Sequence, residues 1–92
     1  MAETFAFDPD WVVAPGETLK EWREENRISA RVLARACGMH IGLLEAIEDG
    51  SHGINDAIAF SLERVTQIPA RLWLNLERQY RTGLQAGKIV MR

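Results

Sequence analysis

Apolar residues on both sides of Gly38 recur with the period of an α-helix. They are Leu33, Ala34 and Cys37 before the glycine and Leu43, Leu44 and Ile47 after it. Glycine enters the left-handed backbone conformation without steric cost, so the first helix is expected to end at Gly38. Asp49-Gly50 closes the second helix. The pattern of residues 33–50 therefore predicts two short helices joined by a tight turn, which is the helix-turn-helix unit.

Capping and helix-breaking residues divide the rest of the chain into further helices. Ser29 and Asn55 are good N-caps, and Pro69 suits the first position of a helix. Leu19 and Trp22 share one face of the first helix, and Trp22 is expected in the core. The first predicted helix begins at Gly16 or Thr18. The other four predicted helices cover residues 30–36, 40–48, 56–66 and 69–84.

The two ends of the chain lack a helical pattern. Phe5, Phe7 and Trp11 lie in an arm that contains proline, where a short strand at Trp11–Val13 fits the sequence. These aromatic residues are expected to pack either on their own domain or on a partner subunit. The tail from Lys88 is β-prone or disordered. The sequence therefore predicts one all-α, five-helix domain at residues 15–84, between an extended arm of residues 1–14 and a tail of residues 85–92.

Composition narrows the class of protein. The 92 residues, 47% of them hydrophobic, suffice for one domain with a packed core. The single cysteine, Cys37, excludes an internal disulfide and is typical of a reducing cytoplasm. No signal peptide or membrane-spanning segment is recognisable, so a cytoplasmic protein that does not act at a membrane is expected.

Charged residues occur in blocks, although the formal net charge is only -2. Residues 38–63 contain acids but neither Lys nor Arg, whereas Arg27, Arg31 and Arg35 follow one another with no acid between them. Arg31 and Arg35 share a helix face because they are four residues apart. They either keep that face solvated or contact the phosphates of DNA.

The sequence contains no recognisable catalytic or metal-binding set. Cys37, His40 and His52 do not match the spacing of zinc ligands, and Cys37 is expected inside the protein. The carboxylates are scattered over predicted solvent faces, and there is neither an activated nucleophile pair nor a phosphate-binding loop. We therefore expect a protein that is not an enzyme and needs no cofactor.

Four segments of the chain are similar, in the same order, to one family of DNA-binding proteins. They read APGETLKE from Ala14, LARACGMHIGLLEAIEDG from Leu33, INDAIA from Ile54 and LWLNLERQY from Leu72. The second segment resembles the helix-turn-helix of the Xre family, the lambda-repressor-like domains. The other three resemble the flanking segments of HigA-type (VapI-like) antitoxins. The resemblance covers residues 14–84.

The resemblance implies a lambda-repressor-like fold and a homodimer, built mainly through the C-terminal helices, that binds a palindromic operator in double-stranded DNA. It also implies that the protein represses its own operon and neutralises a ribonuclease toxin of the RelE superfamily. The residues expected against DNA are Arg31, Arg35, His40, Ile41, Gly42, Glu45, Ser51 and His52. The residues expected in the dimer interface are Leu72, Trp73, Leu76 and Tyr80.

The sequence departs from the family pattern within the motif itself. Ala30 stands where the family usually has a Gln that contacts a phosphate, and the second motif helix lacks the common Arg, Asn or Gln base readers. Glu45 can accept a hydrogen bond from cytosine, and Ile41 can touch a thymine methyl group. Glu45, Glu48 and Asp49 are expected to repel the DNA backbone, which weakens binding.

Two functions are compatible with these features. The first is a sequence-specific, dimeric repressor that is also an antitoxin. The second is a helix-turn-helix fold used as a protein-binding module, in which the acids of residues 38–63 meet a basic partner such as a toxin. Glu45 and Glu48 are expected to make the main contacts in that second function.

Overall fold

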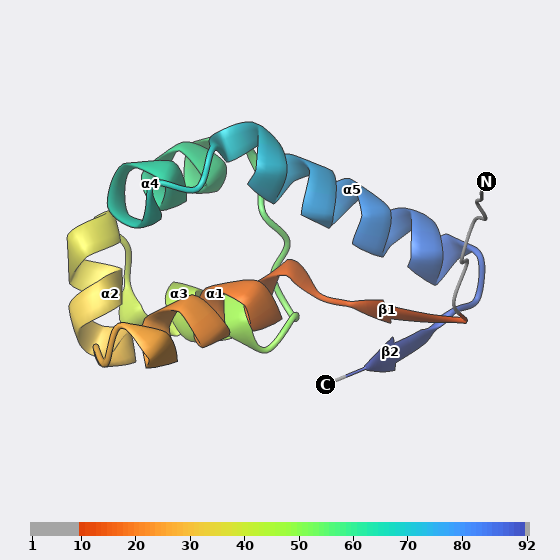
Figure 1. Cartoon of the computed structure of the whole chain (residues 1–92), viewed down its shortest axis with the longest axis horizontal. Helices are drawn as coiled ribbons and strands as arrows, with labels where there is room; N and C mark the ends of the chain where they lie inside the picture. The colour runs from red at the N-terminus through yellow and green to blue at the C-terminus, as the bar shows by residue number, and fades with distance from the viewer. Residues whose placement is uncertain (1–9, 92) are drawn as a thin grey trace, which may run out of the picture.

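Five α-helices and two short β-strands make up residues 10–91, the part of the chain that the computed structural model describes (Figure 1). In chain order they are β1 (Trp11–Val13), α1 (Pro15–Glu25), α2 (Ala30–Cys37), α3 (Ile41–Glu48), α4 (Asp56–Thr66), α5 (Ala70–Gln85) and β2 (Ile89–Met91). The predicted five-helix fold is confirmed, with the helix-turn-helix at α2 and α3. None of the helices in this part of the chain has both the length and the apolar character needed to span a membrane.

Local capping explains where several helices begin and end. Ser29 Oγ accepts a hydrogen bond from Val32 N at 3.1 Å, and Asn55 Oδ1 accepts one from Ile58 N at 2.9 Å. Both predicted N-caps are therefore confirmed. Gly38 ends α2 in the left-handed conformation, with a φ of 70°, as the sequence predicts.

Other predicted boundaries are wrong by one to three residues. Helix α1 begins at Pro15, with Ala14 as its N-cap, because the first helical position needs no N–H donor and suits the fixed φ of proline. Pro69 is the N-cap of α5 rather than its first residue, and His40 is the N-cap of α3 rather than its first residue. Helices α2 and α5 each end one residue later than predicted.

The helices enclose one apolar core, with α5 lying across from α1 and α3 (Figure 1). Trp73 of α5 is the largest fully buried side chain of this core. The next largest fully buried side chains are those of Leu19, Leu33, Leu44, Ile47 and Leu62. The prediction that Trp22 is a core residue is wrong, since its side chain is only half-buried. Leu19 occupies the inward position of α1, and Trp22 packs against the edge of the core.

The strands β1 and β2 pair in parallel, so the first and last segments of the described chain lie side by side (Figure 1). Their central residues, Val12 and Val90, are aligned. A Cβ atom on Gly83 of α5 would lie 2.1 Å from Val12 Cγ1, so the missing side chain makes room for β1. The predicted strand is confirmed, and within it Val12 packs on α5 while Trp11 is 44% exposed. Phe5 and Phe7 lie outside the described residues.

The first turn of α1 lies directly against the last turn of α3. A Cβ atom on Gly16 would be 1.8 Å from Ile47 O and 2.7 Å from Glu48 Cα, which is closer than side-chain atoms approach a backbone. The Pro-Gly-Glu segment therefore has a structural role, in which Pro15 starts the helix and Gly16 lets the backbone of α3 approach it.

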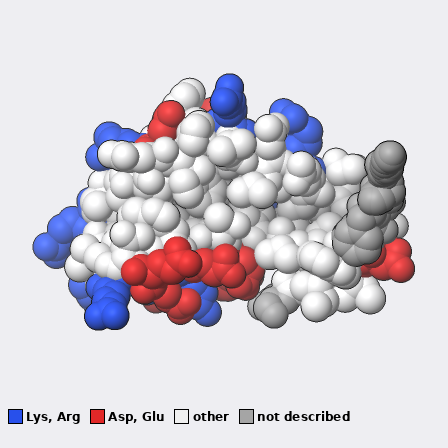
Figure 2. All heavy atoms as spheres, viewed as in Figure 1, with Lys and Arg blue, Asp and Glu red and all other residues white. Residues whose placement is uncertain are grey.

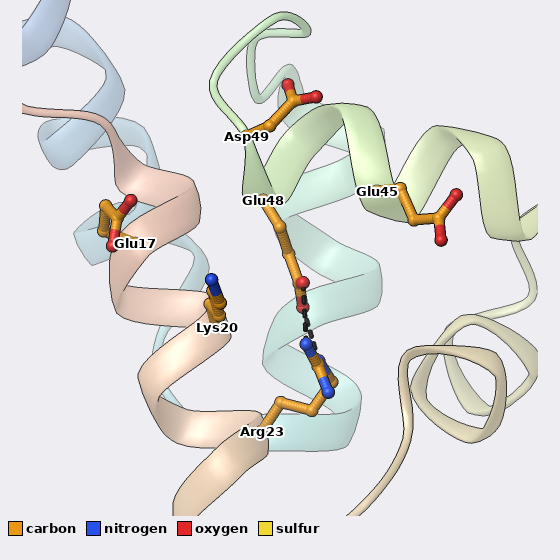
Figure 3. A pocket seen from close by; sticks show the side chains of 6 residues that line it. All are labelled: Glu17, Lys20, Arg23, Glu45, Glu48 and Asp49. Atoms are coloured by element: carbon orange, nitrogen blue, oxygen red, sulfur yellow. Dashed lines mark hydrogen bonds and ion pairs between the residues drawn. The ribbon is translucent and has the colours of Figure 1, made fainter. Parts of the chain in front are cut away.

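A largely buried ion pair joins the same two helices (Figure 3). Arg23 Nε donates to Glu48 Oε2 at 2.7 Å, and Arg23 Nη2 donates to Glu48 Oε1 at 3.0 Å. Arg23 Nη1 donates to Ile28 O at 3.2 Å. The hydrogen bond to Glu48 raises the pKa of Arg23, so the guanidinium remains charged.

The prediction that Glu48 is a free surface acid is wrong. Its residue is only 8% exposed, because it follows the core residue Leu44 by one helical turn and so faces α1. The positive charge of Arg23 compensates the carboxylate in that position.

Replacing Gly16 by alanine is expected to lower the free energy of unfolding by about 3 kcal/mol, because the new Cβ atom forces α1 and α3 apart. Urea denaturation followed by circular dichroism measures this loss. The control is Gly42→Ala, whose Cβ atom would meet only the exposed His40 ring, at 3.2 Å. That variant is expected to change stability by less than about 1 kcal/mol. Equal stability of the two variants would contradict the account of the α1–α3 contact.

Glu48→Gln keeps the shape of the side chain but leaves the guanidinium of Arg23 without its carboxylate. We expect it to cost about 2 kcal/mol of unfolding free energy at neutral pH, since one partner of a largely buried pair is removed. The exposed Glu45→Gln on the same helix is the control, with an expected change within about 0.5 kcal/mol. Both are measured by the same denaturation. A Glu48→Gln protein as stable as the wild type would show that the ion pair does not hold α3.

Candidate nucleic-acid interface

The helices α2 and α3 form a compact unit because each buries one face in the core. Leu33, Ala34 and Cys37 anchor α2, while Leu44 and Ile47 anchor α3. The Gly38 turn joins the two, and its N–H donates to Arg35 O at 3.1 Å. The opposite faces of both helices are open to solvent. This arrangement gives α3 an accessible outer face, as a recognition helix requires.

The structure brings the predicted DNA-contacting residues together on this unit. Those with exposed side chains or backbone are Arg31 and Arg35 on α2, His40 at the start of α3, Gly42 and Glu45 on α3, and Ser51 and His52 in the following loop. Ile41, the remaining member, is half-buried and packs against the core. Figure 2 shows Lys and Arg side chains gathered over the α2 end of the molecule. These positions are compatible with the predicted roles, which remain predictions.

His40 has a structural task in addition to its exposed position. Its Nδ1 atom accepts a hydrogen bond from Gly42 N at 2.9 Å and so caps the first turn of α3. The cap requires Nδ1 to be unprotonated. In the neutral ring the proton is then on Nε2, which is the atom left to donate to an external partner.

The loop after α3 is held against the end of that helix. Asp49 Oδ1 accepts from Ser51 N at 2.8 Å, and Ser51 Oγ donates to Ala46 O at 3.3 Å. The N–H of His52 donates to Ala46 O at 3.1 Å. Ser51 and His52 therefore continue the surface of α3 in a defined position, with the Ser51 hydroxyl hydrogen already engaged.

A charged cleft of about 520 Å³ lies along the contact between α1 and α3, on the side of the ion pair (Figure 3). Its lining residues are Glu17, Lys20, Arg23, Glu45, Glu48 and Asp49. Figure 2 shows the acids of this region as a band over α1 and α3. The contribution of α1 to this surface is not among the predictions from the sequence. The helical spacing of Glu17, Lys20 and Arg23, three residues apart, was the available signal.

Cys37 lies in a different environment from the two histidines. The thiol of Cys37 is buried in the core, and burial raises its pKa. It is therefore protonated at neutral pH, whereas a thiolate is the form that binds metals. His40 and His52 both lie on the exposed side of the unit.

The four residues predicted for a dimer interface differ in how far α5 exposes them. Trp73 and Tyr80, seven residues apart, are buried by their own chain and so cannot meet a partner directly. Leu72 is 46% exposed and Leu76 is half-buried. These two leucines line an apolar groove of about 370 Å³ between α5 and α1, together with Thr18, Ile68, Asn75 and Gln79. Only this half of the predicted set is available to a second subunit.

No protein-family model and no curated protein matches the sequence. Several solved structures do. The chain is 31% identical to the Pseudomonas aeruginosa antitoxin HigA, determined with the higBA promoter, over 79% of this chain and 80% of that chain, with a TM-score of 0.76. It is 32% identical to antitoxin GraA over 79% of this chain and 82% of that chain, with a TM-score of 0.73. An addiction module antidote protein of the HigA family from Coxiella burnetii is 28% identical over 77% of this chain and 78% of that chain, with a TM-score of 0.72. Judged by its fold, its helix-turn-helix and these identities, the chain belongs to the HigA family of antitoxins.

Proposed function

We propose that this antitoxin binds a palindromic DNA operator as a homodimer, represses its own operon and neutralises a ribonuclease toxin. The observation that supports this proposal most is the α2–turn–α3 unit, whose outer face is open and carries Arg31 and Arg35. A relative that is 31% identical has been solved with its promoter. One helix-turn-helix reads half of a palindrome, so two copies are needed for the whole operator.

In the proposed complex, α3 enters the major groove and α2 lies across the DNA backbone. Arg31 and Arg35 contact phosphates, and the Nε2–H group of His40 donates to a third. Ser51 and His52 approach the backbone beyond the end of α3. These contacts set the position of the helix and carry no sequence information of their own.

Base reading falls to the exposed positions of α3. Glu45 can accept a hydrogen bond from the amino group of cytosine, and the half-buried Ile41 offers a methyl group to thymine. Gly42 leaves the backbone of the helix free to approach the groove closely. Glu48 does not repel the DNA as a bare charge, because Arg23 neutralises it.

A second candidate function is supported by the cleft between α1 and α3. Glu17, Glu45 and Asp49 line this cleft, and their charge suits a basic partner such as a toxin. From the sequence, Glu45 and Glu48 are the acids expected to make this contact. Because Glu48 is paired with Arg23, Glu45 is the acid that distinguishes the two functions.

Arg31→Ala and Arg35→Ala are each expected to weaken binding to the DNA upstream of the gene about five- to tenfold at low salt. Each is expected to make the slope of log affinity against log salt about one unit shallower, because one phosphate contact is lost. Fluorescence anisotropy at two or more salt concentrations measures both quantities. Arg71→Ala, an exposed arginine on α5, is the control and is expected to leave both unchanged. The absence of any salt-sensitive binding by the wild type at micromolar concentration would rule out the DNA-binding proposal.

Glu45→Gln separates the two functions because it removes one negative charge without a change of size. If α3 faces DNA, the affinity for DNA without cytosine at the contacted position is expected to rise about threefold or more, since a repulsive charge is lost. If the cleft holds a basic partner, the affinity for the product of the neighbouring gene is expected to fall instead. Anisotropy measures the first and calorimetric titration the second. If neither affinity changes, Glu45 takes part in neither of the two proposed contacts.

A further inference from the structure

The two exposed histidines of the candidate interface carry their ring protons on different nitrogens. His40 Nδ1 accepts from Gly42 N at 2.9 Å, so the neutral ring of His40 is protonated on Nε2. His52 Nδ1 lies 2.7 Å from Gly53 O. Because a carbonyl oxygen can only accept, Nδ1 of His52 must be the donor. The neutral ring of His52 therefore has a lone pair, and no proton, on Nε2.

The loop that carries His52 is held between two helices. The N–H of His52 donates to Ala46 O of α3 at 3.1 Å. A Cβ atom on Gly53 would lie 2.8 Å from both Arg81 Nη2 and Glu77 Oε2, so the loop lies directly against α5. Together with the hydrogen bond of Nδ1, these contacts give the His52 ring a defined position beyond the end of α3.

The charged groups around this loop are engaged elsewhere. The titratable and charged residues of α3, α4 and α5 that adjoin it are Glu45, Asp49, Asp56, Glu77, Tyr80 and Arg81. Glu77 Oε2 accepts from Arg81 Nε at 2.5 Å, and Asp49 Oδ1 accepts a backbone N–H of the loop at 2.8 Å. Glu45 lines the cleft beside α1. Within residues 10–91 the ring of His52 bonds only to Gly53 O, which leaves Nε2 for a partner outside the chain.

Only the protonated form of His52 suits a phosphate. Phosphate oxygens accept hydrogen bonds, so the lone pair of a neutral Nε2 offers them nothing. Protonation leaves the bond from Nδ1 to Gly53 O in place and turns Nε2 into a charged donor. A charge-assisted hydrogen bond is roughly twice as strong as a neutral one. Histidine is also the side chain that changes its charge between about pH 5 and pH 8.

We propose that DNA binds the form of this protein in which His52 is protonated, so that binding takes up a proton and strengthens as the pH falls. The proposal rests on the proposed function, which brings this loop to the DNA backbone. His40 acts in the opposite sense, because protonation of its Nδ1 would remove the acceptor that caps α3. His40 therefore meets DNA in its neutral form and His52 in its charged form.

The positions of the ring protons can be tested without DNA. Long-range proton–nitrogen spectra of the imidazole rings, recorded on the free protein at about pH 8, distinguish the two neutral forms. They are expected to show the proton on Nδ1 in His52 and on Nε2 in His40. A His52 ring protonated on Nε2 would overturn the proposal.

The coupling of binding to protonation is tested by the affinity for the DNA upstream of the gene. At constant salt, the wild type is expected to bind about tenfold more tightly at about pH 6 than at about pH 8. His52→Gln supplies a neutral donor at every pH, so its affinity is expected to change about twofold or less. His40→Asn keeps an acceptor for the α3 cap and is expected to retain the pH dependence of the wild type. Fluorescence anisotropy measures these affinities, and circular dichroism checks that each variant is folded.

Calorimetric titration in two buffers of different ionisation enthalpy counts the protons directly. Net proton uptake on binding is expected for the wild type and for His40→Asn, and almost none for His52→Gln. A wild-type affinity that is equal at both pH values, or proton uptake that persists in His52→Gln, would overturn this proposal and leave the proposed function intact. The absence of DNA binding at both pH values would instead overturn the proposed function, and this proposal with it.

Discussion

The placement of α3 depends on how closely α1 can approach it. At one end of the contact the absent side chain of Gly16 lets the backbone of Ile47 and Glu48 lie against the first turn of α1. Further along α1, Arg23 holds Glu48 through two hydrogen bonds. The orientation of the outer face of α3 follows from these contacts. A recognition helix that shifts by even a small distance loses the registration of its side chains with base edges.

The same contact changes the electrostatics of the proposed interface. Taken as a linear sequence, the end of α3 presents three acids, which argues against DNA. In the folded chain Arg23 neutralises one of them, and Asp49 has an N–H of the following loop as a partner. Glu45 remains as the exposed acid of the helix centre. The arginines lie on the adjoining helix α2. They can therefore attract phosphates at one place while Glu45 discriminates between bases at another.

Features that depend on local chemistry could be predicted from the sequence, because the residues that cause them are neighbours in the chain. Ser29 and Asn55 cap helices through their own following turns, and Gly38 ends α2 through its own backbone conformation. The helix-turn-helix and the order of the five helices follow from such signals. The function of the fold was predicted from the family resemblance, because local chemistry alone does not indicate it.

Features that join distant parts of the chain could not be predicted in the same way. Arg23 and Glu48 are 25 positions apart in the sequence. Strand β1 pairs with β2, although almost the whole domain lies between them in the sequence. Trp22 and Trp73 both lie on apolar helix faces, and only the packing of five helices decides that Trp73 is central. Periodicity also could not show that Trp73 and Tyr80 face inward while Leu72 faces outward, since each is part of one broad apolar stripe on α5.

The central claim is that the outer face of α2 and α3 is the surface that meets DNA. Backbone amide chemical shifts of the isotope-labelled protein, recorded during titration with the DNA upstream of its gene, test it residue by residue. The account predicts the largest shifts in α2, α3 and the loop at Ser51 and His52, with little change in α4. Shifts confined to other helices, or none at all at saturating DNA, would contradict it.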